Sequence, residues 1–90
     1  MPDVFDRVAP DPAEVAFERM LPELSELFAL PVRFLRGCLA NHKLEAIHRI
    51  RRDKDGRLDL AMADAKWFIW RIDFWADTLA RSSENIGPIQ

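Results

Sequence analysis

The stretch "LSELFALPVRFLRGCL", residues 24–39, decides how this chain folds. Its large apolar residues recur at steps of three and four, the spacing of a helix buried along one face; they are Leu24, Leu27, Phe28, Val32, Leu35 and Leu39. Pro31 interrupts the pattern, and a proline inside a helix costs about 3 kcal/mol because it removes a hydrogen bond and clashes with the preceding turn. At the first position of a helix, proline carries no such cost. The stretch therefore predicts two helices joined by a tight turn at Ala29–Leu30, with the second beginning at Pro31.

The residues before this stretch predict a helix start. In "DPAE", residues 11–14, Asp11 can cap a helix, Pro12 suits its first position and Glu14 can complete a capping box. We expect a short helix to about Met20, after which Pro22 restarts or kinks the chain and a second helix runs to about Ala29. Residues 1–10 are predicted to be a flexible arm.

The residues after it predict a β-hairpin over 46–62. "RLDLAM", residues 57–62, alternates apolar and polar side chains, and "EAIHRIRR" before it is short and partly β-branched. Between them lies "DKDG", and Asp-Gly is a strong hairpin signal, so Asp53–Gly56 is the expected tip.

A long aromatic helix is predicted to follow, with a flexible tail over 83–90. One apolar stripe consists of Phe68, Ile72, Trp75 and Leu79, and a second of Trp67, Trp70 and Phe74. A helix apolar on so much of its circumference is hard to cover within 90 residues. We therefore expect Trp67, Trp70 and Phe74 to contact a second copy of the chain or a partner protein.

Composition and charge narrow the class of protein. The length suits one domain, which we place at residues 11–82. No run approaches the roughly 20 apolar residues that span a bilayer, so we expect no membrane contact. The acidic N-terminus and the single Cys38 favour a cytoplasmic protein. The net charge of −2 hides a pattern: residues 1–30 carry −5, residues 31–57 carry +5, and residues 58–90 carry −2. A basic block between acidic segments is a footprint of polyanion binding, or else a solvated surface.

The order of helix, turn, helix, basic hairpin and helix is that of a winged helix-turn-helix. Individual residues of the sequence also resemble the motifs of such families. "LSELFALPVRFLRGCLANHKLEAIHRI" resembles the MerR-like winged helices of phage excisionases, and is similar to the DNA-binding domain of small phage terminase subunits. In these families "A-x-x-[LF]-G-[VA]-S" forms the turn, "G-x-L-P-A" enters the wing, and an aspartate precedes a "W-[YFL]" helix. Residues 25–31, 41–46 and 64–68 occupy these three places. Four residues depart from the pattern: Ala29, Pro31, His42 and Glu45. The resemblance implies a mainly α fold with a small β-hairpin, an added N-terminal helix and a long aromatic C-terminal helix.

The same resemblance implies a binding site for double-stranded DNA. The second helix of the pair would lie in the major groove, with Val32, Leu35 and Leu39 inward and Arg33, Phe34 and Arg36 toward the bases. The rest of the basic block would contact the backbone from the wing and its entry, through Lys43, Arg49, Arg51, Arg52 and Arg57. We expect a homodimeric regulator, excision factor or packaging-type recognition subunit. The acidic leader and the departures from the motif favour an alternative, a protein-interaction module on the same fold, such as a small phage effector, without DNA binding.

Catalytic and metal-binding patterns are not found in the sequence. "DKDG" fails as an EF-hand loop, because alignment of Gly56 with the loop glycine puts Arg51 first and Met62 twelfth, where acids are needed. Cys38 and His42 share a helix but supply too few ligands for zinc, and no serine has a nucleophile's setting. We therefore expect no enzyme activity, no cofactor and no metal.

Overall fold

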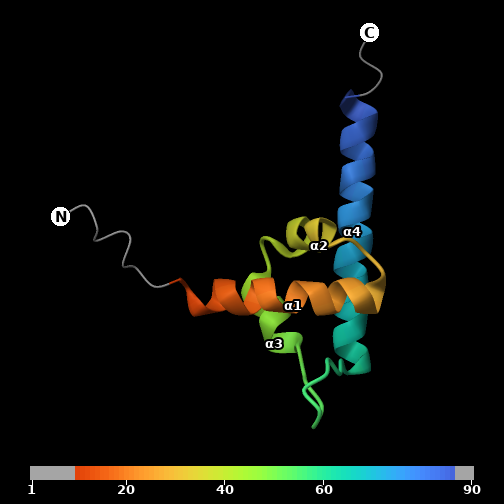
Figure 1. Cartoon of the computed structure of the whole chain (residues 1–90). Helices are drawn as coiled ribbons and strands as arrows, with labels where there is room; N and C mark the ends of the chain where they lie inside the picture. Colours follow the sequence, from red (N-terminus) through yellow and green to blue (C-terminus); the bar gives the residue numbers. More distant parts are fainter. Residues whose placement is uncertain (1–9, 87–90) are drawn as a thin grey trace, which may run out of the picture.

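Four helices make up almost all of the regular structure in residues 10–86, the part of the chain that this computed structural model describes (Figure 1). They are α1 (Pro12–Phe28), α2 (Val32–Leu39), α3 (Lys43–Arg49) and α4 (Met62–Ile86). The predicted arm over 1–10 and the last residues of the predicted tail fall almost wholly outside the described residues. The mainly helical class is confirmed.

Helix α1 is a single helix, so the predicted interruption at Pro22 is wrong. Asp11 caps it as expected, since its side chain accepts a hydrogen bond from the Ala13 N–H at 3.0 Å. Pro22 lies on the exposed side and removes one backbone hydrogen bond. The helix continues because Phe17, Met20, Leu21 and Leu24 are buried along its other side. Burial of each such side chain contributes about 1.5–3 kcal/mol, and the sum outweighs the local cost of a proline.

The turn between α1 and α2 lies where the sequence predicted it. Ala29 ends α1 in the left-handed conformation, with φ 56° and ψ 47°, and Pro31 stands one residue before α2 as its N-cap. The Leu30 N–H donates to the Ser25 carbonyl at 3.1 Å, and the Ser25 hydroxyl donates to the Leu30 carbonyl at 2.5 Å. The two helices are therefore joined by only three residues.

Replacement of Ala29 by glycine is expected to stabilise the protein. The left-handed conformation costs an L-residue about 1–2 kcal/mol, and part of that gain is offset by glycine's greater freedom in the unfolded chain. We expect the midpoint of thermal unfolding to rise by a few degrees, measured by circular dichroism. Ala40→Gly is the matched control, because Ala40 also follows a helix but has the right-handed φ of −55°. It should lower the midpoint, and a rise for both variants would contradict the argument.

Helix α3 replaces the first strand of the hairpin predicted over 46–62, and that prediction is wrong. Lys43, Leu44, Glu45, Ala46 and Arg49 all favour helix, and only Ile47 in this segment is β-branched. Burial of Ala46 against the core and the Arg49–Glu45 ion pair one turn apart support the helix. What is left of the hairpin is one antiparallel bridge, Arg52 to Leu58, around the predicted tip, where Gly56 has φ 79°. A winged-helix hairpin is thus not established.

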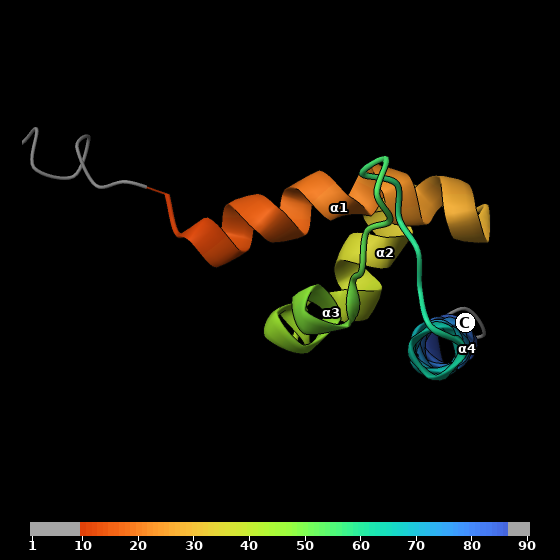
Figure 2. The same cartoon turned by 90° about the horizontal axis from the view of Figure 1, so that it is seen from below.

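The core lies where α1 packs against α2 and α3, and α2 packs against α4. Viewed from below, α1 forms one row, α2 and α3 the next, and α4 is seen end-on beside them (Figure 2). The fully or almost fully buried side chains are Phe17, Met20, Leu21, Leu24, Leu35, Cys38, Leu39, Ala46 and Phe68. Helix α4 thus contributes one fully buried residue among those described, Phe68, with Ile72 and Trp75 half-buried beside it.

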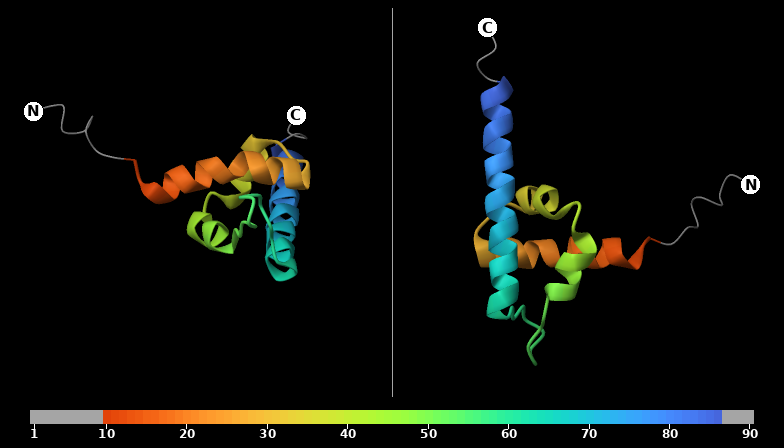
Figure 3. Two further views of the ribbon diagram at one scale, coloured as in Figure 1. Left: turned by 60° about the horizontal axis from the view of Figure 1, so that its bottom comes forward. Right: turned by 180° about the vertical axis from the view of Figure 1, so that it is seen from behind.

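Helix α4 extends well beyond the other three helices (Figures 1 and 3). The flexible tail predicted from residue 83 is wrong in its first part, because α4 continues to Ile86. The residues of this extension include no glycine or proline before Gly87, so nothing local ends the helix earlier. The part of α4 that follows Trp75 therefore lies outside the core.

Candidate functional site

Helix α2 presents two arginines to solvent, Arg33 opposite its buried residues and Arg36 on the flank that faces α1. Leu35 and Leu39 are fully buried, while Arg33 and Arg36 are exposed. This is the orientation that the sequence predicted for a helix with one face free to bind. Phe34 differs from the prediction: it is half-buried and packs against the core, because it flanks Leu35 and Cys38 on the helix surface.

Arg36 and Lys43 are held by carboxylates of α1. The Arg36 guanidinium donates to both oxygens of Glu18, at 3.0 Å from Nε and 2.7 Å from Nη2. Lys43 donates to both oxygens of Glu14, at 2.9 and 2.8 Å, and lies 5.3 Å from the centre of the Phe17 ring. The hydrogen bond from Arg36 lowers the pKa of Glu18, so this pair persists at pH values where an ordinary glutamate begins to take up a proton.

Arg49 and Arg52 also face carboxylates. Arg52 donates to both oxygens of Glu23 at 2.6 Å, and this hydrogen bonding lowers the pKa of Glu23. Arg49 donates to Glu45 at 2.9 Å and to Asp64 at 3.0 Å, and its guanidinium lies 4.8 Å from the centre of the Trp67 ring. Both arginines therefore have structural partners within the molecule.

The three ion pairs made by carboxylates of α1 hold this helix on both sides of its buried stripe. Glu14 and Glu18 are one turn apart and share one flank of α1, whereas Glu23 lies half a turn away on the other flank. Accordingly α2 and the remnant of the hairpin lie on opposite sides of α1 (Figure 1). Four of the eight predicted DNA-binding residues, Arg36, Lys43, Arg49 and Arg52, are thus neutralised locally.

Three of the predicted DNA-binding cations remain exposed: Arg33, Arg51 and Arg57 form no ion pair with any residue in the described range. The structure does not bring them into one cluster, since Arg33 is on α2 and the other two flank the tip of the loop. Sequence reasoning missed the carboxylates that hold the remaining cations. The four-residue spacing of Glu14 and Glu18 was a usable signal for a charged flank, but not for its partners.

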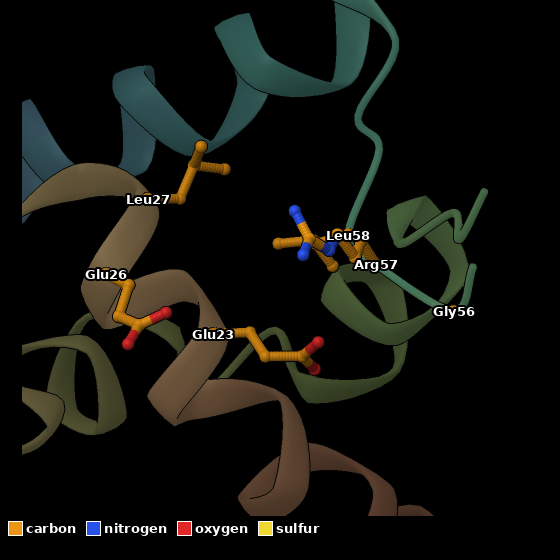
Figure 4. A pocket seen from close by; sticks show the side chains of 6 residues that line it. All are labelled: Glu23, Glu26, Leu27, Gly56, Arg57 and Leu58. Carbon is orange, nitrogen blue, oxygen red and sulfur yellow. The ribbon is translucent and has the colours of Figure 1, made fainter.

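An open groove lies between the C-terminal half of α1 and the tip of the loop. It has a volume of about 610 Å³ and is lined by Glu23, Glu26, Leu27, Gly56, Arg57 and Leu58. Figure 4 shows the carboxylates of Glu23 and Glu26 on one wall and the Arg57 side chain on the other. The mixed charge and the open shape give this groove no clear preference for one class of ligand.

The aromatic residues of α4 divide into two environments. Trp67 is half-buried with its ring edge-on to Phe68, their centres 5.0 Å apart, so it belongs to the edge of the core as well as to the predicted partner stripe. Trp70 and Phe74 are exposed, by 59% and 53%. The predicted partner surface therefore contracts to these two residues and their neighbours.

Other chemistry has little support among the described residues. Burial raises the pKa of the Cys38 thiol to about 11, so the thiolate that a nucleophile requires is scarce at neutral pH. In the described part of the chain, no three histidine, cysteine or acidic side chains gather in a way that could hold a metal ion. None of the described helices is long and apolar enough to cross a membrane.

Comparisons with known proteins identify no relative. No family model matches this sequence, and searches of curated proteins and of solved structures likewise produce no match. A proposal for the function therefore rests on the residues and on their geometry.

Proposed function

We propose that this chain binds double-stranded DNA through α2, as the second helix of a helix-turn-helix pair. The observation that carries the proposal is the exposed Arg33 in the first turn of α2, opposite the buried Leu35 and Leu39 and directly after a three-residue turn, with the exposed Arg36 one turn further on. In helix-turn-helix proteins the early residues of the second helix contact base edges in the major groove. Arg33 and Arg36 are three residues apart and so project from the same face.

Arg33 is the base-reading residue in this proposal. Its guanidinium is exposed and makes no ion pair with a described residue, so it can form the bidentate pair with guanine for which arginine is suited. Arg51 and Arg57, on either side of the loop tip, supply contacts to phosphates. Asp53 and Asp55 at the tip would repel phosphate, so these contacts come from the sides of the loop.

The carboxylates of α1 limit the strength of binding. Glu18 occupies the Arg36 guanidinium and places negative charge beside the proposed reading face. With Arg51 and Arg57 as the two available phosphate contacts, the logarithm of the binding constant should fall with the logarithm of salt concentration with a slope of roughly −2. Binding is therefore expected to be weak and sensitive to salt.

A specificity measurement tests the proposal. The full chain is titrated at low salt against a pooled library of duplex fragments, and the best fragment is compared with random DNA by fluorescence anisotropy. Arg33→Ala should reduce the preference for the best site by about 1–3 kcal/mol, which is roughly 5- to 150-fold. Arg19→Ala, an exposed arginine on α1 with the same change of charge, and Lys54→Ala at the loop tip should leave the preference unchanged. A preference that falls for Lys54→Ala but not for Arg33→Ala would place the reading helix elsewhere.

Release of Arg36 provides a second readout. Glu18→Gln frees the guanidinium and removes a negative charge beside α2, so affinity for all duplex sequences should rise several-fold. Glu26→Gln makes the same charge change on the same helix, at a residue with no ion pair to a described residue, and should raise affinity less. Equal effects of the two variants would show that the Arg36 face does not contact DNA.

A protein-interaction module is the second candidate function. The observation that favours it is that half of the predicted DNA-binding residues pair with carboxylates of the same chain. Three of these carboxylates, Glu14, Glu18 and Glu23, come from α1. Ion pairs of this kind make the surface mixed in sign, whereas nucleic-acid interfaces are strongly positive. Absence of binding to the fragment library at low salt would establish this candidate over the first.

A further inference from the structure

The exposed side of α4 carries two large aromatic residues with nothing packed over them in the described structure. Trp70 and Phe74 are four residues apart, one above the other on the helix surface. Phe68, Ile72 and Trp75 lie on the opposite side of the same helix and face the core. Trp70 and Phe74 therefore lie on the side of α4 that faces away from the core.

Arg71 holds the two rings in place. Its guanidinium lies 5.2 Å from the centre of the Trp70 ring and 4.9 Å from the centre of the Phe74 ring. A cation over aromatic faces is attracted by their negative charge distribution. The two side chains are thus ordered before any partner arrives, which reduces the conformational entropy lost on binding.

Charged residues of opposite sign flank the aromatic pair along the helix. Lys66 precedes Trp70 by one turn, and Asp73 follows it by three residues; both are exposed and lie on the same flank of the aromatic face. Asp77, on the same side, already faces Arg81 at 3.0 Å. Along this face a basic residue therefore precedes Trp70 and an acidic residue follows it.

We propose that this face binds a second copy of the chain, with the two α4 helices antiparallel and crossing near Trp70. A two-fold axis there brings Trp70 against its counterpart and places Lys66 of one copy at the level of residue 74 of the other, about 1.5 Å along the axis from Asp73. Each copy thus supplies one Lys66–Asp73 pair, and both pairs form. A parallel arrangement would instead put Lys66 and Asp73 of the two copies on opposite edges of the contact, where neither pair forms.

The rest of the molecule is compatible with this arrangement. In each copy the other three helices pack on the far side of α4, so the two bodies would lie outside the pair of helices. The apolar surface offered by each copy is small, which predicts a dimer of modest affinity, with a dissociation constant on the order of 10 μM.

Sedimentation equilibrium of the full chain tests the dimer without DNA. We expect a concentration-dependent dimer around tens of micromolar. Trp70→Ala should make the protein monomeric at these concentrations while its circular dichroism spectrum stays unchanged, because Trp70 is 59% exposed. Leu44→Ala is the matched control, an exposed apolar residue (61%) on α3, and should leave the dimer intact. A monomeric unmodified chain, or a dimer unaffected by Trp70→Ala, would overturn the proposal.

Charge exchange tests the antiparallel direction. Lys66→Glu alone and Asp73→Lys alone should each weaken self-association at least tenfold, since each sets like charges together across the two-fold axis. A mixture of the two variants should form a heterodimer, because both cross-pairs then join opposite charges. In a parallel dimer these residues of the two copies lie on opposite edges of the contact and do not meet. Neither single variant would then weaken association and no mixed dimer would be favoured, and that result would overturn the antiparallel assignment. These measurements contain no DNA. A result against the dimer would therefore leave the proposal of DNA binding untouched.

Discussion

Replacement of Phe68 by alanine is expected to destabilise the protein by about 3–5 kcal/mol. Phe68 is fully buried and is the anchor of α4, with its ring centre 6.0 Å from that of Phe28 and 5.0 Å from that of Trp67. The loss is this large because the transfer free energy of the ring is forfeited and a cavity remains. A domain of this length has only about 5–13 kcal/mol of stability in total, so Phe68→Ala should lose a large share of it.

Thermal unfolding followed by circular dichroism measures this loss. For a domain of this size each kcal/mol lowers the midpoint by about 4–8 °C, so we expect a fall of at least about 12 °C. Phe74→Ala is the matched control, since it removes the same side chain from an exposed position of the same helix. At concentrations too low for self-association it should change stability by less than about 0.5 kcal/mol. Similar losses for the two variants would mean that α4 packs through a different face.

Replacement of Gly37 by valine is expected to have the second largest effect. Gly37 lies where α2 packs on α4, and a Cβ atom there would stand 3.1 Å from Cζ2 of Trp75 and 3.4 Å from its Nε1. A branched side chain would force the indole to move, and overpacking of this kind costs about 1–3 kcal/mol. Gly37→Ala is the milder variant, because up to about 1 kcal/mol of helix propensity offsets its single tight contact.

Urea unfolding of the Gly37 series and of a double variant locates the cause. Gly37→Val should lower the free energy of unfolding, and Trp75→Leu alone should lower it through lost packing. If the valine acts by displacing the indole, the double variant Gly37→Val with Trp75→Leu should be more stable than the sum of the two single losses predicts. Strict additivity would show that the helices cross elsewhere.

Part of the candidate site followed from the sequence alone. The outward direction of Arg33 follows from the three- and four-residue spacing of Val32, Leu35 and Leu39, because helix geometry ties the two faces together. The exposure of Trp70 and Phe74 was expected for a related reason, since one stripe of α4 is enough for so small a core. Trp67 belongs to that predicted stripe yet is half-buried, because it lies at the stripe's edge beside Phe68 and Arg49.

The sequence by itself determined where α1 begins, where α1 and α2 are separated and where the loop turns. Asp11 and Pro12 start α1, Ala29 to Pro31 separate it from α2, and Gly56 shapes the tip of the loop. These are local matters, decided by backbone conformation and by hydrogen bonds between residues a few positions apart.

Only the tertiary structure decided what lies between those points and what the charges do. α1 continues through Pro22, and residues 43–49 form a helix rather than a strand, because both segments bury apolar side chains against the same core. The basic block that the sequence marks as a polyanion site is half neutralised, since Arg36 meets Glu18 and Arg52 meets Glu23 across 18 and 29 residues of chain. Pairing over such separations depends on how the helices pack and not on local spacing. These ion pairs therefore cannot be predicted from the pattern of residues along the chain.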